Sequence, residues 1–431
     1  MDQRFLLGIF LVFATMAALA SDTSSVHYPP SARPGELSLE ATFHLWVPPK
    51  AKHLRALIVH QHGCGEGAER SGEMAALDLH WRALAERHHA GLLSPHYHAG
   101  TNKCSTWCDP RKGSDTAFLR ALNDLAEQSG HSELTTVPWC LWGHSGGGYW
   151  VSLMLALHPE RIAGAFCRSG AANMWANEVG DLKYPAAAFM IPVMLNPGTK
   201  EKGDSQFNGA WTGTWQFFEE FRAKGAPVAF APDPFSSHNC RNSRLVAIPF
   251  FDACLKERLA RLGTALKVVQ QNRGFVGDWR TGAIRRSLSV TNELSWLPNE
   301  NCARAFSEYV KHGITTDTTA PETAPVITNL MRTTEGVVVE WSARADFESG
   351  IRQFTIYRNG KLLTRLPENP KDPTGFAQFQ TLSYHDTPTP DAPMLRFIDT
   401  NALSGEVWYA LSIINGAQLE GPRSKPARLR E

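Results

Sequence analysis

The chain has 431 residues, of which 43% are hydrophobic and 13 are tryptophan, and this composition is typical of a globular protein long enough for two domains. Lysine and arginine together number 43 against 42 aspartate and glutamate residues, so the formal net charge is +1. A charge this balanced argues against nucleic acid or an anionic membrane surface as a partner.

Residues 1–20 have the pattern of a secretory signal peptide. Arg4 forms a thin positive region, residues 5–17 are apolar, and Ala18-Leu19-Ala20 is a small-residue cleavage site. The apolar run is shorter than the roughly 20 residues that a transmembrane helix needs. We therefore expect a secreted or periplasmic protein with no membrane span after signal removal, and an uncleaved anchor is the alternative.

Strand-like and helix-like segments alternate along the next part of the chain. Residues 36–48 alternate as an opening antiparallel strand pair would, and further strands are predicted at residues 56–62, 90–95, 137–142, 162–168, 190–196 and 227–231. Helices are predicted at residues 67–88, 115–127, 211–223 and 243–262. This alternation predicts an α/β fold with a doubly wound, mostly parallel sheet. Residues 264–312 look irregular except for a short helix at 302–311, and we expect them to pack against this sheet domain.

The composition changes at residues 314–321, a Thr/Pro-rich segment typical of a linker. Short strands are predicted beyond it at residues 336–341, 353–358 and 406–413, and Asn359-Gly360 is a hairpin signal. We therefore predict a first domain at residues 21–313 and an all-β sandwich at residues 322–431.

Residues 143–147 read Gly-His-Ser-Gly-Gly and lie between the apolar run 137–142 and a helix-like stretch at 149–158. A G-x-S-x-G sequence between a strand and a helix is the pattern of a nucleophile elbow. The turn is so tight that side chains flanking Ser145 would collide with the strand or the helix, which explains the glycines. The pattern predicts that Ser145 is a catalytic nucleophile, and an ordinary Gly-rich turn is the alternative.

A serine nucleophile needs a base, and in this architecture the order along the chain is Ser, acid, His. The histidines after Ser145 are His158, His238, His312 and His385. His158 lies along the helix after the elbow, roughly 20 Å from Ser145 at about 1.5 Å per residue. His312 and His385 lie in a later part of the chain whose sequence pattern differs from the strand–helix alternation. His238 follows the strand at 227–231 in a polar loop that can reach the serine, so we predict it as the base.

The acid should follow the buried strand at residues 190–196, which ends in a turn at Gly198. Glu201 comes three residues later and is well placed to accept the second ring proton of His238, so we favour it. Asp204 is the main alternative, and Asp181 and Asp233 also remain open.

The strand at 56–62 runs into a Gly-rich turn, His62-Gly63-Cys64-Gly65. A backbone N–H of this turn can join the N–H of Gly146 to hold a tetrahedral oxyanion. We favour Cys64 as this donor, with its neighbour Gly63 as the alternative. His62, Trp107 and Trp175 are candidates for lining the substrate site, with Trp211 as a further aromatic residue, and core packing is the alternative for all of them.

Eight cysteines in an exported chain permit disulfides. Cys104 and Cys108 lie in a loop that should reach the same sheet edge, where it either bridges to Cys64 or closes on itself. Cys140 and Cys167 fall on successive strands and are expected to be core thiols.

Two His-x-His pairs, His60/His62 and His96/His98, end strands at the same edge. Only one member of each pair would face the pocket, and no carboxylate or cysteine has a matching spacing. We therefore predict no metal and no cofactor.

The HGCG turn at 62–65, the GHSGGG elbow at 143–148 with His158-Pro159-Glu160-Arg161 after it, and the SHNC loop at 237–240 resemble the α/β-hydrolase superfamily. Within it, the chain is most similar to secreted esterases and polyhydroxyalkanoate-depolymerase-like enzymes, over roughly residues 35–260. The resemblance implies an eight-stranded, mostly parallel sheet and Ser-acid-His hydrolysis without a cofactor. Glu201 stands where most relatives carry aspartate. Trp341, the run 356–360 and Tyr409 resemble a fibronectin type III domain, with both aromatic residues in its core.

These features together predict a secreted serine hydrolase that cleaves carboxylic esters of a small molecule or a polymer through an acyl-enzyme. A serine peptidase on the same fold and a catalytically silent binding protein are the alternatives.

Overall fold

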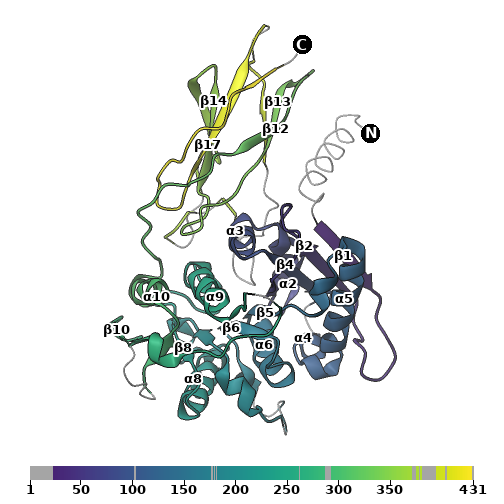
Figure 1. Ribbon diagram of the computed structural model, residues 1–431, viewed down its shortest axis with the longest axis vertical. Coiled ribbons are helices and arrows are strands. Elements are labelled where there is room, and N and C mark those ends of the chain that lie inside the picture. The colour runs from purple at the N-terminus through teal and green to yellow at the C-terminus, as the bar shows by residue number, and fades with distance from the viewer. Residues whose placement is uncertain are drawn as a thin grey trace.

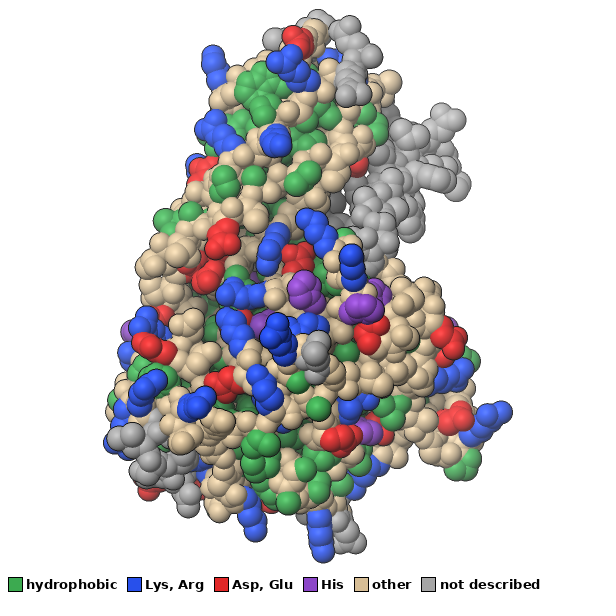
Figure 2. Space-filling model, viewed as in Figure 1, with side chains coloured by type: hydrophobic (Ala, Val, Ile, Leu, Met, Phe, Trp, Pro, Cys, Tyr) green, Lys and Arg blue, Asp and Glu red, His purple; other side chains and the backbone are tan. Residues whose placement is uncertain are grey.

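A computed structural model describes residues 23–100, 103–175, 178, 180, 182–261, 263–286, 293–370, 375–377, 379–380, 395–402 and 405–429. The predicted signal peptide lies outside the described residues. Within these ranges, no helix combines the length and the apolar character needed to cross a bilayer. On the face shown in Figure 2, basic and acidic side chains are interspersed, in keeping with the balanced composition.

An eight-stranded sheet forms the centre of the α/β part, with the strand order β1-β2-β4-β3-β5-β6-β7-β8 (Figure 1). Strands β3 to β8 run parallel to one another, whereas β2, near one edge, is antiparallel to both of its neighbours, β1 and β4. The strands are β1 (Thr23–Tyr28), β2 (Ala41–Trp46), β3 (Ala56–Gln61), β4 (Ala90–Tyr97), β5 (Trp139–His144), β6 (Ile162–Arg168), β7 (Val193–Asn196) and β8 (Val228–Phe230).

Helices cover both faces of this sheet (Figure 1). One core contains side chains of α5 (Ser114–Ser129), α6 (Gly146–Leu157) and α8 (Asn208–Ala223). The core on the other face contains side chains of α3 (Leu79–His88), α9 (Arg244–Arg258) and α10 (Glu300–His312). Leu57 and Val59 of β3 join the first core while Ile58 joins the second, as the two-residue period of a strand requires. This is the architecture of the α/β-hydrolase fold, so the predicted fold class is confirmed.

Two predicted elements were wrong in detail. Residues 36–48 hold one strand, β2, and its antiparallel partner is β1, with His27 opposite Thr42. Alternation marks a half-buried strand but does not say where its partner lies. The helix predicted at 67–88 is divided into α2 (Glu66–Met74) and α3, because Asp78 caps a new helix by accepting from the backbone N–H groups of His80 and Trp81.

The segment predicted to be irregular contains a small three-stranded sheet of β9 (Phe275–Gly277), β10 (Ile284–Arg286) and β11 (Ser295–Leu297), followed by α10. It packs against the central sheet, since the Ser295 hydroxyl accepts from the Phe230 N–H at 2.9 Å. Hydrophobic periodicity could not reveal strands of three residues each.

The C-terminal region forms two antiparallel sheets around a common core. One sheet contains β12 (Val326–Thr333), β13 (Gly336–Ser342) and β16 (Arg396–Asp399), and the other contains β14 (Gln353–Arg358), β15 (Lys361–Leu366), β17 (Trp408–Ile414) and β18 (Ala427–Arg428). Asn359 and Gly360 join β14 to β15 with φ of 49° and 80°, as a tight hairpin turn requires. Trp341 and Tyr409 are buried in the core. The all-β class is therefore confirmed, whereas the domain boundaries stay a prediction.

The C-terminal region and α3 share contacts. Leu79 and Ala83 of α3 belong to the same buried cluster as the core of the two sheets. The His80 ring hydrogen bonds to the Phe347 carbonyl at 2.9 Å, and Arg344 pairs with Glu86 at 3.0 Å. The C-terminal region is thus held against one helix of the α/β part.

Candidate active site

Ser145 lies between β5 and α6 with φ of 53° and ψ of −118°, a backbone conformation that non-glycine residues rarely adopt. The neighbouring glycines make this turn possible. A Cβ atom on Gly143 would collide with the carbonyl of Gly147, and one on Gly147 would collide with the carbonyl of His62. Ser145 itself is partly exposed and follows the carboxyl end of β5.

Ser145, His238 and Glu201 form a continuous hydrogen-bonded chain. The Oγ atom of Ser145 lies 2.8 Å from Nε2 of His238, and Nδ1 of His238 lies 2.7 Å from Oε1 of Glu201. Solvent exposure decreases from the serine to the acid, since His238 is 7% exposed and Glu201 is 0% exposed. The structure therefore brings together the three residues that the sequence pointed to, although they follow three different strands, β5, β8 and β7.

Glu201 ends the 3-10 helix Thr199–Glu201, which follows β7. Its second oxygen, Oε2, accepts from the backbone N–H of Gly198 at 3.1 Å, which leaves Oε1 directed at the imidazole. The His238 ring is stacked on Phe207 with ring centres 4.2 Å apart, and its carbonyl accepts a hydrogen bond from His144 Nε2 at 2.9 Å. His238 is thus held in place through both its ring and its backbone carbonyl.

The other acid candidates have different roles. Asp204 accepts from the backbone N–H groups of Gln206 and Phe207 at 2.8 and 2.9 Å, which hold the turn before α8 and lower the pKa of Asp204. Asp233 is buried and accepts from the N–H groups of Phe235 and Ser236, so it shapes the loop that carries His238. Asp181 lies outside the described residues.

The turn that contains Cys64 lies directly against the elbow. Cys64 forms a disulfide with Cys104, with Cα atoms 5.3 Å apart, and a Cβ atom on Gly146 would collide with both sulfur atoms. Of the two pairings predicted, the bridge to Cys64 is the one present. Cys108 is a buried free thiol, and burial raises its pKa to about 12. Cys140 and Cys167 are also buried free thiols, as expected for core positions.

Two predicted substrate-lining residues are buried behind this turn. His62 is 0% exposed, and its ring nitrogens hydrogen bond to the Gly63 carbonyl and the Tyr97 N–H at 2.6 and 3.0 Å. Burial lowers the pKa of His62 to about 4, so the ring is neutral. Trp107 is also 0% exposed and is stacked on Tyr97. Both side chains support the wall of the site and do not line its surface.

The other two tryptophans differ in exposure. Trp175 is partly exposed and packs on Tyr149 with ring centres 4.9 Å apart, so it remains a candidate for substrate contact. Trp211 is buried and packs on Phe230 in the core of the α/β part.

Arg168 is a functional candidate that sequence reasoning missed. It ends β6, is 0% exposed, and donates to the carbonyls of Asn239 and Ser237 and to the Ser236 hydroxyl at 2.9, 3.2 and 2.7 Å. These three residues flank His238 on both sides. Burial opposes the charge, but nearby acidic and phenolic groups outweigh it and raise the pKa of Arg168. An arginine at the carboxyl end of a predicted buried strand was the available signal.

No family model and no curated protein matches the chain. Among solved structures, a thermostable esterase has a TM-score of 0.37 and 16% identity, with 50% of this chain and 55% of that one covered. An S-formylglutathione hydrolase from Agrobacterium tumefaciens has a TM-score of 0.37 and 15% identity over 54% of this chain and 93% of that one. A ferulic acid esterase has a TM-score of 0.35 and 16% identity, with 50% of this chain and 91% of that one covered.

The chain thus spans about half the length of the thermostable esterase. Because the identities and TM-scores are low, the inference about function rests on the geometry around Ser145.

Proposed function

We propose that this protein is a serine hydrolase that cleaves carboxylic esters through an acyl-enzyme intermediate. The observation that carries the proposal is the hydrogen-bonded chain from Ser145 through His238 to Glu201, with heavy-atom distances of 2.8 and 2.7 Å. A serine hydroxyl is a weak nucleophile until an adjacent base accepts its proton. The strained backbone of Ser145 supports the same role, because strain of this kind is concentrated at functional sites.

In the first half of the reaction, Ser145 Oγ attacks the ester carbonyl carbon and its proton passes to Nε2 of His238. Glu201 holds the proton on Nδ1 and stabilises the imidazolium that forms. His238 then gives the proton to the leaving alcohol as the carbon–oxygen bond breaks. In the second half, water attacks the acyl carbon while His238 accepts its proton. His238 then returns this proton to Ser145 Oγ as the acyl–oxygen bond breaks and the free acid leaves.

The oxyanion of the tetrahedral intermediate needs two preorganised donors. We assign this role to the backbone N–H groups of Gly146 and Cys64. Gly146 is the first residue of α6, where N–H groups have no partner within the helix and carry a partial positive charge. The disulfide from Cys64 to Cys104 lies over Gly146, which supports a fixed spacing between the two donors.

The proposed location is outside the cytoplasm. The disulfide supports it, because such bonds persist in oxidising compartments. For the substrate we propose a small-molecule or polymeric ester. Phe207 beside His238 and the partly exposed Trp175 offer apolar surface for its acyl or alcohol group.

A fluorophosphonate probe tests the nucleophile directly, because it reacts with activated serines. We expect labelling of the wild-type protein at Ser145, no labelling of Ser145→Ala, and unchanged labelling of Ser205→Ala, a control at an exposed serine. Ser145→Ala and His238→Ala should each lower ester hydrolysis by several orders of magnitude, and the double variant should be hardly worse, because the groups act as one unit. Labelling that persists in Ser145→Ala would refute the proposal.

A substrate panel tests the bond that is cleaved. It contains acyl esters of graded chain length, feruloyl esters, acetyl-xylan, a polyester film and peptide anilides, each compared with Ser145→Ala. Faster cleavage of anilides than of esters would identify a peptidase, and no turnover with no probe labelling would identify a binding protein.

A further inference from the structure

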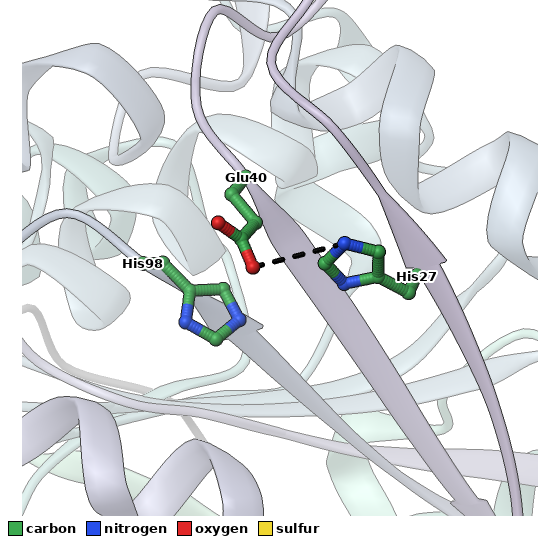
Figure 3. Close-up of side chains that lie close together, drawn as sticks. All are labelled: His27, Glu40 and His98. Atoms are coloured by element: carbon green, nitrogen blue, oxygen red, sulfur yellow. Dashed lines mark ion pairs between the residues drawn. The ribbon is translucent and has the colours of Figure 1, made fainter.

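A second group of chemically active side chains lies at the β1 edge of the central sheet. Its residues belong to or adjoin β1, β2 and β4, whereas Ser145 follows β5. His27, Glu40 and His98 point toward one another from three separate segments (Figure 3). One donor atom of each residue lies within 4.8 Å of the donors of the other two. Nε2 of His27 and Oε1 of Glu40 are 3.7 Å apart.

The strand register explains why these residues meet. His27 of β1 is paired with Thr42 of β2, and Thr42 is paired with His96 of β4. Glu40 and His98 lie one strand period away from Thr42 and His96, so all five side chains share one face of the sheet. The backbone N–H of His98 donates to the Glu40 carbonyl at 2.9 Å, which extends the ladder to this pair.

We propose that His27, Glu40 and His98 bind a divalent transition-metal ion of the zinc class, with water completing the coordination. Two imidazole nitrogens and one carboxylate oxygen are a donor set that Zn²⁺ prefers. Ligands about 2.0–2.1 Å from a tetrahedral metal lie about 3.3 Å apart, so the His27–Glu40 pair needs little movement. His27 and Glu40 are 54% and 47% exposed, so an ion reaches them directly and their side chains can rotate to close the remaining gap.

Thr42 orients two of the proposed ligands. Its hydroxyl lies 3.1 Å from Nδ1 of His27 and 3.1 Å from Nε2 of His98. For His27 this contact holds the ring by Nδ1 and leaves Nε2 directed at Glu40. A hydrogen bond to the nitrogen that does not bind the ion is the usual support of a histidine ligand.

The ion would tie the edge strand β1 to the start of β2 and to the end of β4. β1 is paired on one side only in the central sheet, with β2 as its neighbour. Because the ion binds the folded arrangement and not the separated segments, it stabilises the folded protein by an amount that rises with the logarithm of its concentration above Kd. This site departs from the expectation of no metal, which rested on the His-x-His pairs alone and did not include His27 or Glu40. The Ser145 chemistry does not depend on the ion.

The test is titration of the full-length, chelator-stripped protein with ZnCl₂ by calorimetry. We expect one equivalent bound in the micromolar range, and a loss of about tenfold or more in affinity in His27→Ala, Glu40→Gln and His98→Ala. Thr42→Val, which keeps the shape and removes the hydroxyl, should weaken binding by about tenfold. His53→Ala and Glu335→Gln, at exposed positions elsewhere, are the matched controls and should bind as the wild type does.

Two further measurements keep the outcome decisive if one variant folds poorly. ZnCl₂ should raise the melting temperature of the wild type and of His53→Ala but not that of His27→Ala. Co²⁺ should give the visible absorption of a four- or five-coordinate nitrogen and oxygen site in the wild type and in His53→Ala but not in His27→Ala. Absence of binding at millimolar Zn²⁺ would overturn the proposal, and so would binding that survives His27→Ala and His98→Ala but is lost in His96→Ala.

Discussion

Oε1 of Glu201 lies 2.7 Å from Nδ1 of His238, so this carboxylate is the one in contact with the imidazole. Asp204, three residues later, instead accepts backbone hydrogen bonds at the start of α8. We expect Glu201→Gln to lower kcat by roughly ten-thousandfold, because tautomer control and imidazolium stabilisation are both lost. Asp204→Asn should change kcat by less than about tenfold, since it touches only a turn. Steady-state kinetics on a small ester checks this, and the reverse ranking would transfer the role to Asp204.

Arg168 is expected to position His238 without touching substrate. Arg168→Lys keeps the charge but loses the planar fork that reaches four partners, three of which flank His238, so kcat should fall by about a hundredfold with KM little changed. Arg258→Lys is the matched control, because Arg258 is also buried and donates to the Ile162 carbonyl at the opposite end of β6. It should lose stability and keep its kcat. Equal loss of kcat in both variants would mean that Arg168 is only a general support of the fold.

Removal of the disulfide should affect stability and rate together. The bond between Cys64 and Cys104 closes a loop of 40 residues, for which the chain-entropy relation gives about 4 kcal/mol of stability. The Cys64→Ser/Cys104→Ser variant should show this loss in urea unfolding. It should also have a lower kcat, because the disulfide no longer fixes the turn that carries the backbone N–H of residue 64, one proposed oxyanion donor. A phosphine reductant should reproduce both effects in the wild type and add nothing in the variant. An unchanged kcat in the folded variant would exclude a role for the bond in the site.

A chain that ends near residue 313 tests the role of the C-terminal region. The proposed catalytic residues all precede residue 240, so the rate on small soluble esters should be retained. The melting temperature should fall, because Leu79 and Ala83 of α3 lose their apolar neighbours. Full burial of a leucine side chain stabilises a protein by about 1.5–3 kcal/mol. Truncated protein that is folded but inactive on small esters would show that the C-terminal region shapes the active site. A loss on insoluble substrate alone would indicate a targeting role.

Glu257 on α9 should make stability depend on pH. Burial raises its pKa to about 7, and Lys267 opposes this only in part. The folded state therefore binds more protons than the unfolded state between about pH 4.5 and 7, so the contribution of Glu257 to stability falls as pH rises through this range.

Glu257→Gln removes the penalty and should stabilise the protein at pH 8, with little gain at pH 4.5. Thermal unfolding at both values checks this, with Glu219→Gln as an exposed control. A gain of the same size at both pH values would contradict a titration effect.

Local sequence was sufficient for the elements whose signal is local. The strand–turn–helix around Ser145 was predicted because a tight turn needs glycine wherever a Cβ atom would meet backbone. The predicted strand at 162–168 coincides with β6, since a fully buried parallel strand is a continuous apolar run. His238 was reached by elimination, because the order of groups along the chain limits the choice in this fold. By contrast, α2 and α3 were merged, since the cap at Asp78 interrupts a pattern that periodicity alone reads as continuous.

Contacts between distant segments were decided only by the tertiary structure. Spacing favoured Glu201 over Asp204, but the hydrogen bond to His238 depends on how two loops from different strands meet. The tertiary structure also decides that His62 and Trp107 are buried and that Cys104, not Cys108, forms the disulfide with Cys64. It likewise decides which groups Arg168 contacts. His27, Glu40 and His98 share no motif spacing and meet because strand register aligns them on one face. The hydrophobic pattern of the sequence predicts which side of a strand a residue lies on, whereas only the register of the packed sheet determines which residues lie opposite one another.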